Sequence, residues 1–202
     1  MKTRKQLLTA MFILIALNMA NAQVQLGITA GIGGATQSCF GDIYNNDDLF
    51  TGFNAGITLR KPVSETFALK TNLLYALKGR SFDVKEGNNY IKNTDKFNYL
   101  TLPVEVEYSI PVLKNRLFVA AGPYAGLLLD AKREIEDKSS SLNDETKNFD
   151  FGLAFELGFS KKCFSKNELQ FSVNYDMGLV KIADYDEDLR NKALNFNVGF
   201  LF

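Results

Sequence analysis

The sequence predicts an all-β protein, specifically an eight-stranded antiparallel up-and-down transmembrane β-barrel. Three observations predict it: eight segments in which apolar and polar residues alternate, connections that are alternately long and short, and an amino-terminal segment typical of exported proteins. The chain has 202 residues, of which 46% are hydrophobic, and this length suits one domain.

The amino-terminal segment predicts a signal peptide over residues 1–22. Lys2, Arg4 and Lys5 precede an apolar run at 7–17, and Ala20-Asn21-Ala22 has the small-residue form of a cleavage site. Residues 23–202 then form the barrel domain. Without the signal's three basic residues, 20 basic side chains face 23 acidic ones, so nucleic acid is not an expected partner.

The alternation has a period of two, which is the period of a strand. The eight expected strands are 24–33, 52–60, 67–80, 99–108, 117–129, 149–159, 168–179 and 194–202. The segment 149–159 alternates without a break, whereas 67–80 has exceptions at Thr71 and Leu74, and 117–129 is apolar on both sides.

The connections alternate in length along the chain. Long ones of about 12 to 18 residues surround Asp47, Asn88, Ser140 and Asp186, and those around Pro62, Pro111 and Cys163 have about 6 to 8 residues. This pattern predicts a bacterial outer-membrane barrel with long extracellular loops and both mature termini in the periplasm.

The composition of the two strand faces favours lipid outside the barrel. Phenylalanine and tyrosine occur near the strand ends on the apolar face, as in interfacial girdles, while Gly, Asn, Thr and Ser crowd the polar face and suit a narrow filled lumen. A soluble periplasmic binding barrel is the alternative, in which the apolar face would be the sealed core.

Several segments resemble the Bacteroidetes-type outer-membrane β-barrel family often called PorT-like. They are YLTLPVEVEY at 99–108, AAGPYAGLLL at 120–129, FDFGLAFELGF at 149–159, NYDMGLVKI at 174–182 and FNVGFLF at 196–202. The resemblance covers the mature chain and implies the barrel fold and the outer membrane. Some members of the wider group are tied to protein secretion, and no functional residue carries over.

Charged residues on the polar face predict an ionic network of mixed sign inside the lumen. Its principal members are Arg60, Lys70, Glu105, Glu107 and Glu156, with Lys70 expected near Glu107 across one antiparallel pair. Lys78, Arg80, Asp150 and Asp176 are expected to face the same interior. Neutralisation of charge in a packed barrel is the favoured interpretation, because buried charges are normally paired. The alternative is a proton or cation relay through Glu105 and Glu107.

Other motifs give no catalytic, cofactor or metal site. The sequence has no histidine, which excludes Ser-His-Asp and Cys-His catalysis, and we predict that the protein is not an enzyme. The aspartates at 184, 186 and 188 resemble the start of a calcium loop, but Leu189 stands where that loop needs glycine. The glycines at 31, 33 and 34 are expected to make room for lumen side chains rather than to bind phosphate. Cys39 and Cys163 are expected at opposite ends of the barrel, too far apart to pair.

The sequence therefore predicts a small closed barrel that acts as a structural or interaction module through its extracellular loops. The loop at 130–147 is the preferred contact region, and its composition suggests a flexible exposed segment. The alternative function is an accessory of an outer-membrane protein-secretion machine or a narrow solute conduit. The expected partners are outer-membrane lipid and an envelope or secretion-machinery protein, with no cofactor.

Overall fold

The computed structural model describes residues 24–37, 49–86, 89–113, 115–135, 138–164, 167–183 and 189–202. The predicted signal peptide, Cys39 and the aspartates of the first and last long loops lie outside these residues. None of the described residues forms a helix long and apolar enough to cross a bilayer.

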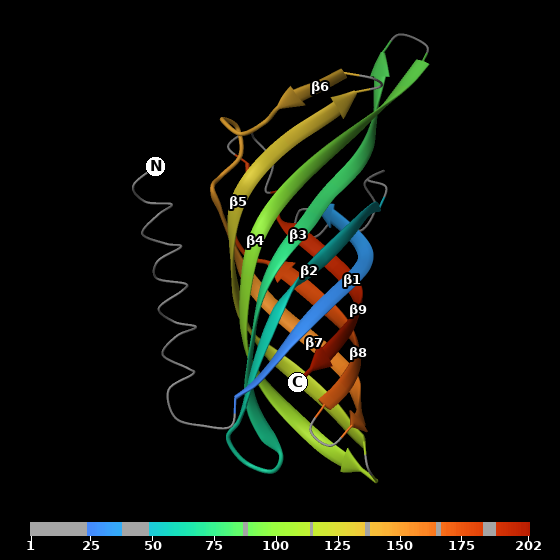
Figure 1. Ribbon diagram of the computed structural model, residues 1–202. Coiled ribbons are helices and arrows are strands. Elements are labelled where there is room, and N and C mark those ends of the chain that lie inside the picture. Colours follow the sequence, from blue (N-terminus) through green and yellow to red (C-terminus); the bar gives the residue numbers. More distant parts are fainter. Residues whose placement is uncertain are drawn as a thin grey trace.

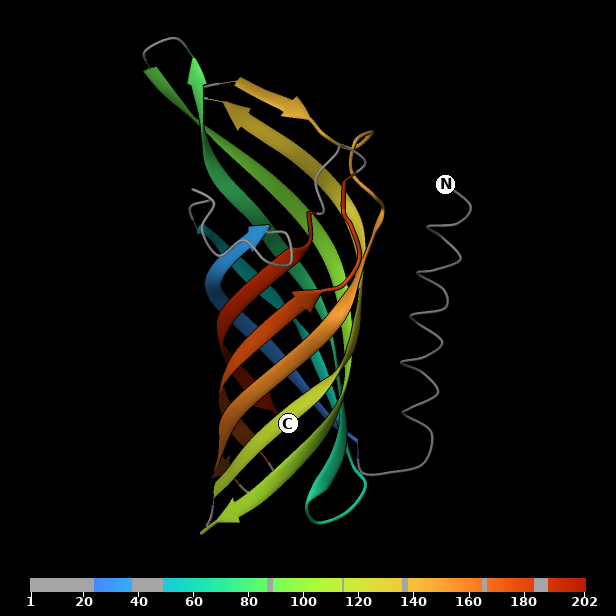
Figure 2. The same ribbon diagram turned by 180° about the vertical axis from the view of Figure 1, so that it is seen from behind.

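Eight long antiparallel strands form one closed barrel (Figures 1 and 2). They are β1 (Gln25–Gln37), β2 (Phe50–Pro62), β3 (Phe67–Glu86), β4 (Asn89–Val112), β5 (Asn115–Ile135), β7 (Phe149–Phe164), β8 (Asn167–Gly178) and β9 (Asn191–Leu201). Each of the eight strands pairs with the next one along the chain, including β4 with β5. The first strand, β1, also pairs with the last, β9, so that the barrel has no open edge along its shared height. A short strand, β6 (Lys138–Ser141), pairs with the end of β5.

The alternation predicted from the sequence matches the two faces of the barrel wall. Large apolar side chains point outward and are exposed, such as Ile32 at 67%, Leu157 at 60% and Phe196 at 61%. Their polar neighbours point inward and are buried, including Asn54, Glu105 and Glu156. An outward apolar surface surrounding an inward polar core is the arrangement that a bilayer requires.

Glycine allows a close approach at one point inside the wall. A Cβ at Gly31 of β1 would lie 1.6 Å from Oδ1 of Asn197 on the adjacent β9. The lumen-facing amide of Asn197 therefore occupies the space that a side chain on β1 would fill, as the sequence predicted for this glycine cluster.

Three strands continue far beyond their predicted ends. Pairing of β2 with β3 stops at Phe53 and Leu77, yet β3 and β4 remain paired up to Glu86 and Asn89. The segment around Asn88, predicted as a long loop, is therefore mostly a β-hairpin. Together with the ends of β5 and β6, this hairpin rises above the rest of the barrel (Figure 1). We call residues 79–86, 89–98, 130–135 and 138–141 the sheet extension.

A β-bulge joins the barrel to the sheet extension. Tyr99 pairs with Leu128, but the preceding Asn98 pairs with Asp130, so Leu129 is an additional residue on β5. The extra residue reverses the alternation along β5, which places Leu128 and Ala131 on the same inner side. The bulge lies at the end of the segment 117–129, whose two faces looked alike in the sequence because inward-facing residues such as Phe118, Ala120 and Tyr124 are also apolar.

Candidate functional site

The lumen contains a dense set of charged side chains. Among the described residues, six basic and seven acidic side chains line the lumen or its upward continuation. The basic ones are Arg60, Lys70, Lys78, Arg80, Arg116 and Arg133, and the acidic ones are Asp95, Glu105, Glu107, Asp150, Glu156, Glu168 and Asp176.

The layer nearest the short turns is centred on Glu107, which is fully buried. Its Oε1 atom accepts hydrogen bonds from Nε of Arg60 at 2.9 Å and from the hydroxyl of Ser109 at 2.8 Å, and it also contacts Arg116. The Nη2 atom of Arg116 reaches Oε2 of Glu168 on β8 at 2.7 Å. Side chains of β2, β4, β5 and β8 are thus joined across the end of the lumen.

The central layer pairs its two lysines with carboxylates. Lys70 donates from Nζ to Oε2 of Glu156 at 2.6 Å, and Nζ of Lys78 lies 3.0 Å from Asp176 and 3.6 Å from Asp150. Each lysine also faces an aromatic ring, Phe118 for Lys70 and Tyr124 for Lys78. Such cation–π contacts strengthen when they are removed from water.

Glu105 differs from the other central carboxylates. It lies opposite Lys70 in the β3–β4 ladder and is 1% exposed, yet neither carboxylate oxygen has a hydrogen-bond partner. Glu105 lines a cavity of about 30 Å³ that is also lined by Asn54, Asn72 and Thr101. This volume accommodates about two water-sized groups, so the central lumen is filled rather than open.

The upper layer lies at the base of the sheet extension. Asp95 of β4 is fully buried and accepts hydrogen bonds from Arg133 at 2.6 and 2.9 Å and from Arg80 at 3.3 Å. The ring of Phe82 lies 4.6 Å from the guanidinium carbon of Arg80 and 5.5 Å from that of Arg133. These contacts join β3, β4 and β5 where β2 no longer pairs with β3.

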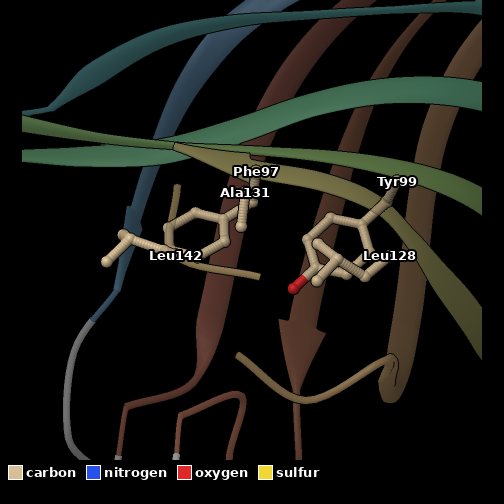
Figure 3. Close-up of a cluster of buried hydrophobic side chains, with 5 residues drawn as sticks. All are labelled: Phe97, Tyr99, Leu128, Ala131 and Leu142. Atoms are coloured by element: carbon tan, nitrogen blue, oxygen red, sulfur yellow. The ribbon is translucent and has the colours of Figure 1, made fainter. Parts of the chain in front are cut away.

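The sheet extension also has a hydrophobic cluster beneath it (Figure 3). Phe97, Tyr99, Leu128 and Ala131 are buried and pack with Leu142, which follows β6. The segment around Leu142 is further tied down, because its backbone N–H donates to the carbonyl of Ala131 at 2.9 Å. The prediction of a loop at 130–147 is therefore wrong for 130–135 and 138–141, which form strands, while 142–147 lie outside the named strands and most described residues of the segment are exposed. The serine-rich composition concealed a strand that pairs with β5.

The five predicted lumen residues all face inward, but their pairing differs from the prediction in one respect. Lys70 lies directly opposite Glu105, while Glu107 lies opposite Ala68 and bonds to Arg60. Alternation fixes the face of a residue, whereas the register between two strands depends on the turn and on packing.

The sequence reasoning missed Asp95, Arg116, Arg133 and Glu168 as members of the network. Asp95 and Arg133 fell in segments predicted to be loops. Arg116 immediately precedes the expected start of its strand. A signal was present for Arg116, because it has the same parity as Phe118 and Ala120, which face inward.

The fold and this lumen define a class of protein, the small closed β-barrels of the bacterial outer membrane. A family model described as outer membrane protein beta-barrel domain matches residues 14–184, and the chain belongs to this family. The family places the protein in the bacterial outer membrane.

Solved structures of outer-membrane proteins are similar to this chain at low sequence identity. Neisserial surface protein A is 13% identical, with 89% of this chain and 97% of that chain covered and a TM-score of 0.53. Ail, the attachment invasion locus protein of Yersinia pestis, is 15% identical over 88% of this chain and 98% of that chain, with a TM-score of 0.44. Outer membrane protein W of E. coli is 13% identical over 91% and 100%, with a TM-score of 0.43. No curated protein matches the sequence.

Proposed function

We propose that this protein is an interaction module of the outer membrane, which presents the sheet extension to a protein partner on the outside of the cell. The observation that carries the proposal is the ordered sheet extension, with a hydrophobic cluster and a buried Arg–Asp–Arg group of its own. In this proposal the long-loop end faces outward and a signal peptide at 1–22 directs export.

An ordered extension suits recognition because little conformational entropy is lost when a partner binds. Its surface carries exposed apolar groups, with Tyr90 at 70% and Ile135 at 37% exposure. Charged groups lie beside them, including Lys132 and the Lys96–Glu134 pair. Exposed aromatic and aliphatic side chains among charged ones are typical of surfaces that bind proteins.

The lumen favours this role over that of a solute conduit. Arginine–carboxylate groups occupy both ends, and the central cavity of about 30 Å³ is too small for a hydrated solute. We therefore expect the purified barrel to show no stable conductance in planar bilayers. A steady conductance that Glu105→Gln suppresses would instead support the relay or conduit.

Site-specific photo-crosslinking in intact cells tests the proposal. A photoreactive residue at position 90, in the hairpin of the extension, should give a discrete crosslinked product. The matched control is position 113, whose Leu113 is 97% exposed in the β4–β5 turn at the opposite end. Equal crosslinking at both positions, or none at position 90, would refute the proposal.

The identity of the crosslinked product separates two partner classes. A subunit of an export machine would support the role of secretion accessory that the resemblance to the PorT-like group implies. Another envelope or extracellular protein would support a general interaction module.

A further inference from the structure

An open groove of about 890 Å³ lies on the outer side of the barrel wall, at the end that carries the sheet extension. Its floor is formed by Phe149 and Phe151, which lie on the outward face of β7, and by Val180, two residues after the end of β8. All three side chains are exposed, whereas Asp150 between the two phenylalanines is buried and faces the lumen. The groove therefore belongs to the face of the wall that contacts lipid.

The rim of the groove is polar. The side chains that form it come from two segments, 142–148 and 179–183, and they are Asn143, Asp144, Thr146, Lys147, Asn148 and Lys181. Among the described residues that line the groove, two are lysines and one is an aspartate, so the lining carries one net positive charge. An aromatic floor thus lies directly below a rim of hydrogen-bonding and mostly basic side chains.

Backbone hydrogen bonds hold the two rim segments side by side (Figure 2). The N–H of Lys147 donates to the carbonyl of Ile182 at 2.8 Å, and a β-bridge joins the same two segments. The N–H groups of Leu179 and Val180 both donate to the carbonyl of Phe151, at 2.8 and 3.3 Å, which fixes the second segment to β7. Because the groove is formed by the fold itself, little conformational entropy is lost when a ligand enters it.

We propose that this groove binds the headgroup and upper acyl chain of an anionic, phosphate-bearing lipid from the leaflet at the long-loop end. The floor contacts the acyl chain, because Phe149 and Phe151 lie at the end of the apolar band, where aromatic girdles meet the membrane interface. The rim lies at the height of the headgroups. Lys147 and Lys181 bring positive charge to that height, and basic pockets beside a membrane bind anionic headgroups. The proposal goes beyond the protein interaction proposed above and does not depend on it.

The position of the floor favours a lipid over a water-soluble ligand. A soluble phosphate compound would have to displace acyl chains from Phe149 and Phe151 and would leave those side chains against a polar group. A lipid keeps its acyl chain on the phenylalanines while its phosphate reaches the rim. The groove therefore matches both parts of one lipid molecule.

The chain has no tryptophan, which allows a test at a single site. Phe151→Trp places one tryptophan in the floor of the groove. The matched control is Phe196→Trp, on the exposed outward face of β9 and outside the groove. Each variant is refolded into vesicles that mix phosphatidylglycerol with phosphatidylcholine, in which one of the two lipids carries bromine on its acyl chains. Bromine quenches a tryptophan that it contacts, so the fluorescence gives the relative affinity of the two lipids at each position.

We expect phosphatidylglycerol to be preferred about fivefold at position 151, the effect of one net positive charge near a membrane surface, and not at position 196. In the Phe151→Trp background, Lys147→Gln combined with Lys181→Gln should abolish the preference. Asp144→Asn should raise it by about a further fivefold. Lys161→Gln is the control substitution, because Lys161 is exposed at the opposite end of β7, and it should leave the preference unchanged.

Four results would overturn the proposal. Equal affinity for the two lipids at position 151 would show that the groove does not select an anionic headgroup. An equal preference at positions 151 and 196 would assign the selectivity to the barrel as a whole. A preference that survives the double lysine substitution would mean that these lysines do not bind the phosphate. A preference abolished by inorganic phosphate, but not by sodium chloride of the same ionic strength, would show that the groove binds soluble phosphate instead of lipid.

Discussion

Phe155→Arg tests the assignment of the outer barrel face to lipid. Phe155 lies on the outward face of β7, between the aromatic residues Phe149 and Phe159, and is 41% exposed. Ten residues at a rise of about 3.3 Å, tilted by about 40°, span roughly 25 Å, which is the height of the apolar band. Phe155 then lies within about 3 Å of its centre.

An arginine near the centre of the band costs about 2–4 kcal/mol, whereas one near the interface costs about 0–1 kcal/mol. We therefore expect Phe155→Arg to reduce the folding equilibrium constant about 30- to 900-fold. The matched control is Phe149→Arg, because Phe149 lies on the same face of the same strand with 39% exposure but at its end.

The assay is refolding into phospholipid vesicles followed by denaturant titration, with far-UV circular dichroism and resistance to trypsin as the two readouts. Phe155→Arg should shift the midpoint to lower denaturant concentration, while Phe149→Arg should shift it by much less. Equal midpoints for the two variants would place this face in water and refute the assignment.

Three further predictions address the lumen, the barrel wall and one turn. Glu107→Gln leaves Arg60 and Arg116 without their shared carboxylate, so the free energy of unfolding should fall by about 3–5 kcal/mol in the same denaturant titration. The control is Glu134→Gln, in a partly exposed ion pair, which should change this free energy by less than about 1 kcal/mol. Gly31→Ala places a Cβ 1.6 Å from Oδ1 of Asn197 and should lower the free energy of unfolding by about 1–3 kcal/mol. Gly199→Ala should leave stability nearly unchanged, because the nearest atom to its Cβ lies at 3.5 Å, and equal losses for the two variants would contradict the packing described. Leu113 has a φ of 57° in the β4–β5 turn, so Leu113→Gly should raise stability by about 1 kcal/mol, and a decrease would argue against this backbone geometry.

The sequence predicted the barrel wall well because lipid and lumen impose opposite demands on alternate residues. Phe155 and Glu156 are neighbours in sequence, yet one faces outward and the other is buried beside Lys70. This constraint acts on every spanning residue, so alternation alone identified the strands and the inward position of Glu105.

The sheet extension could not be predicted in the same way, because no bilayer acts on it. Its strands carry Asp95, Lys96 and Arg133, which resemble loop composition when they are considered one at a time. The structure pairs these strands, with Asp95 on β4 opposite Arg133 on β5 and hydrogen-bonded to it. The bulge at Leu129 hid the connection further by reversing the alternation of β5.

The distribution of arginine and lysine along the lumen explains why a cavity remains at its centre. A guanidinium is planar with five donors and can join several acceptors, as Arg116 does between Glu107 on β4 and Glu168 on β8. Arginines occupy both ends of the lumen and connect strands there. The compact ammonium groups of Lys70 and Lys78 leave more space, and the unpaired Glu105 lies in that space. The arrangement that closes the barrel to solutes is thus also the one that encloses a small polar cavity.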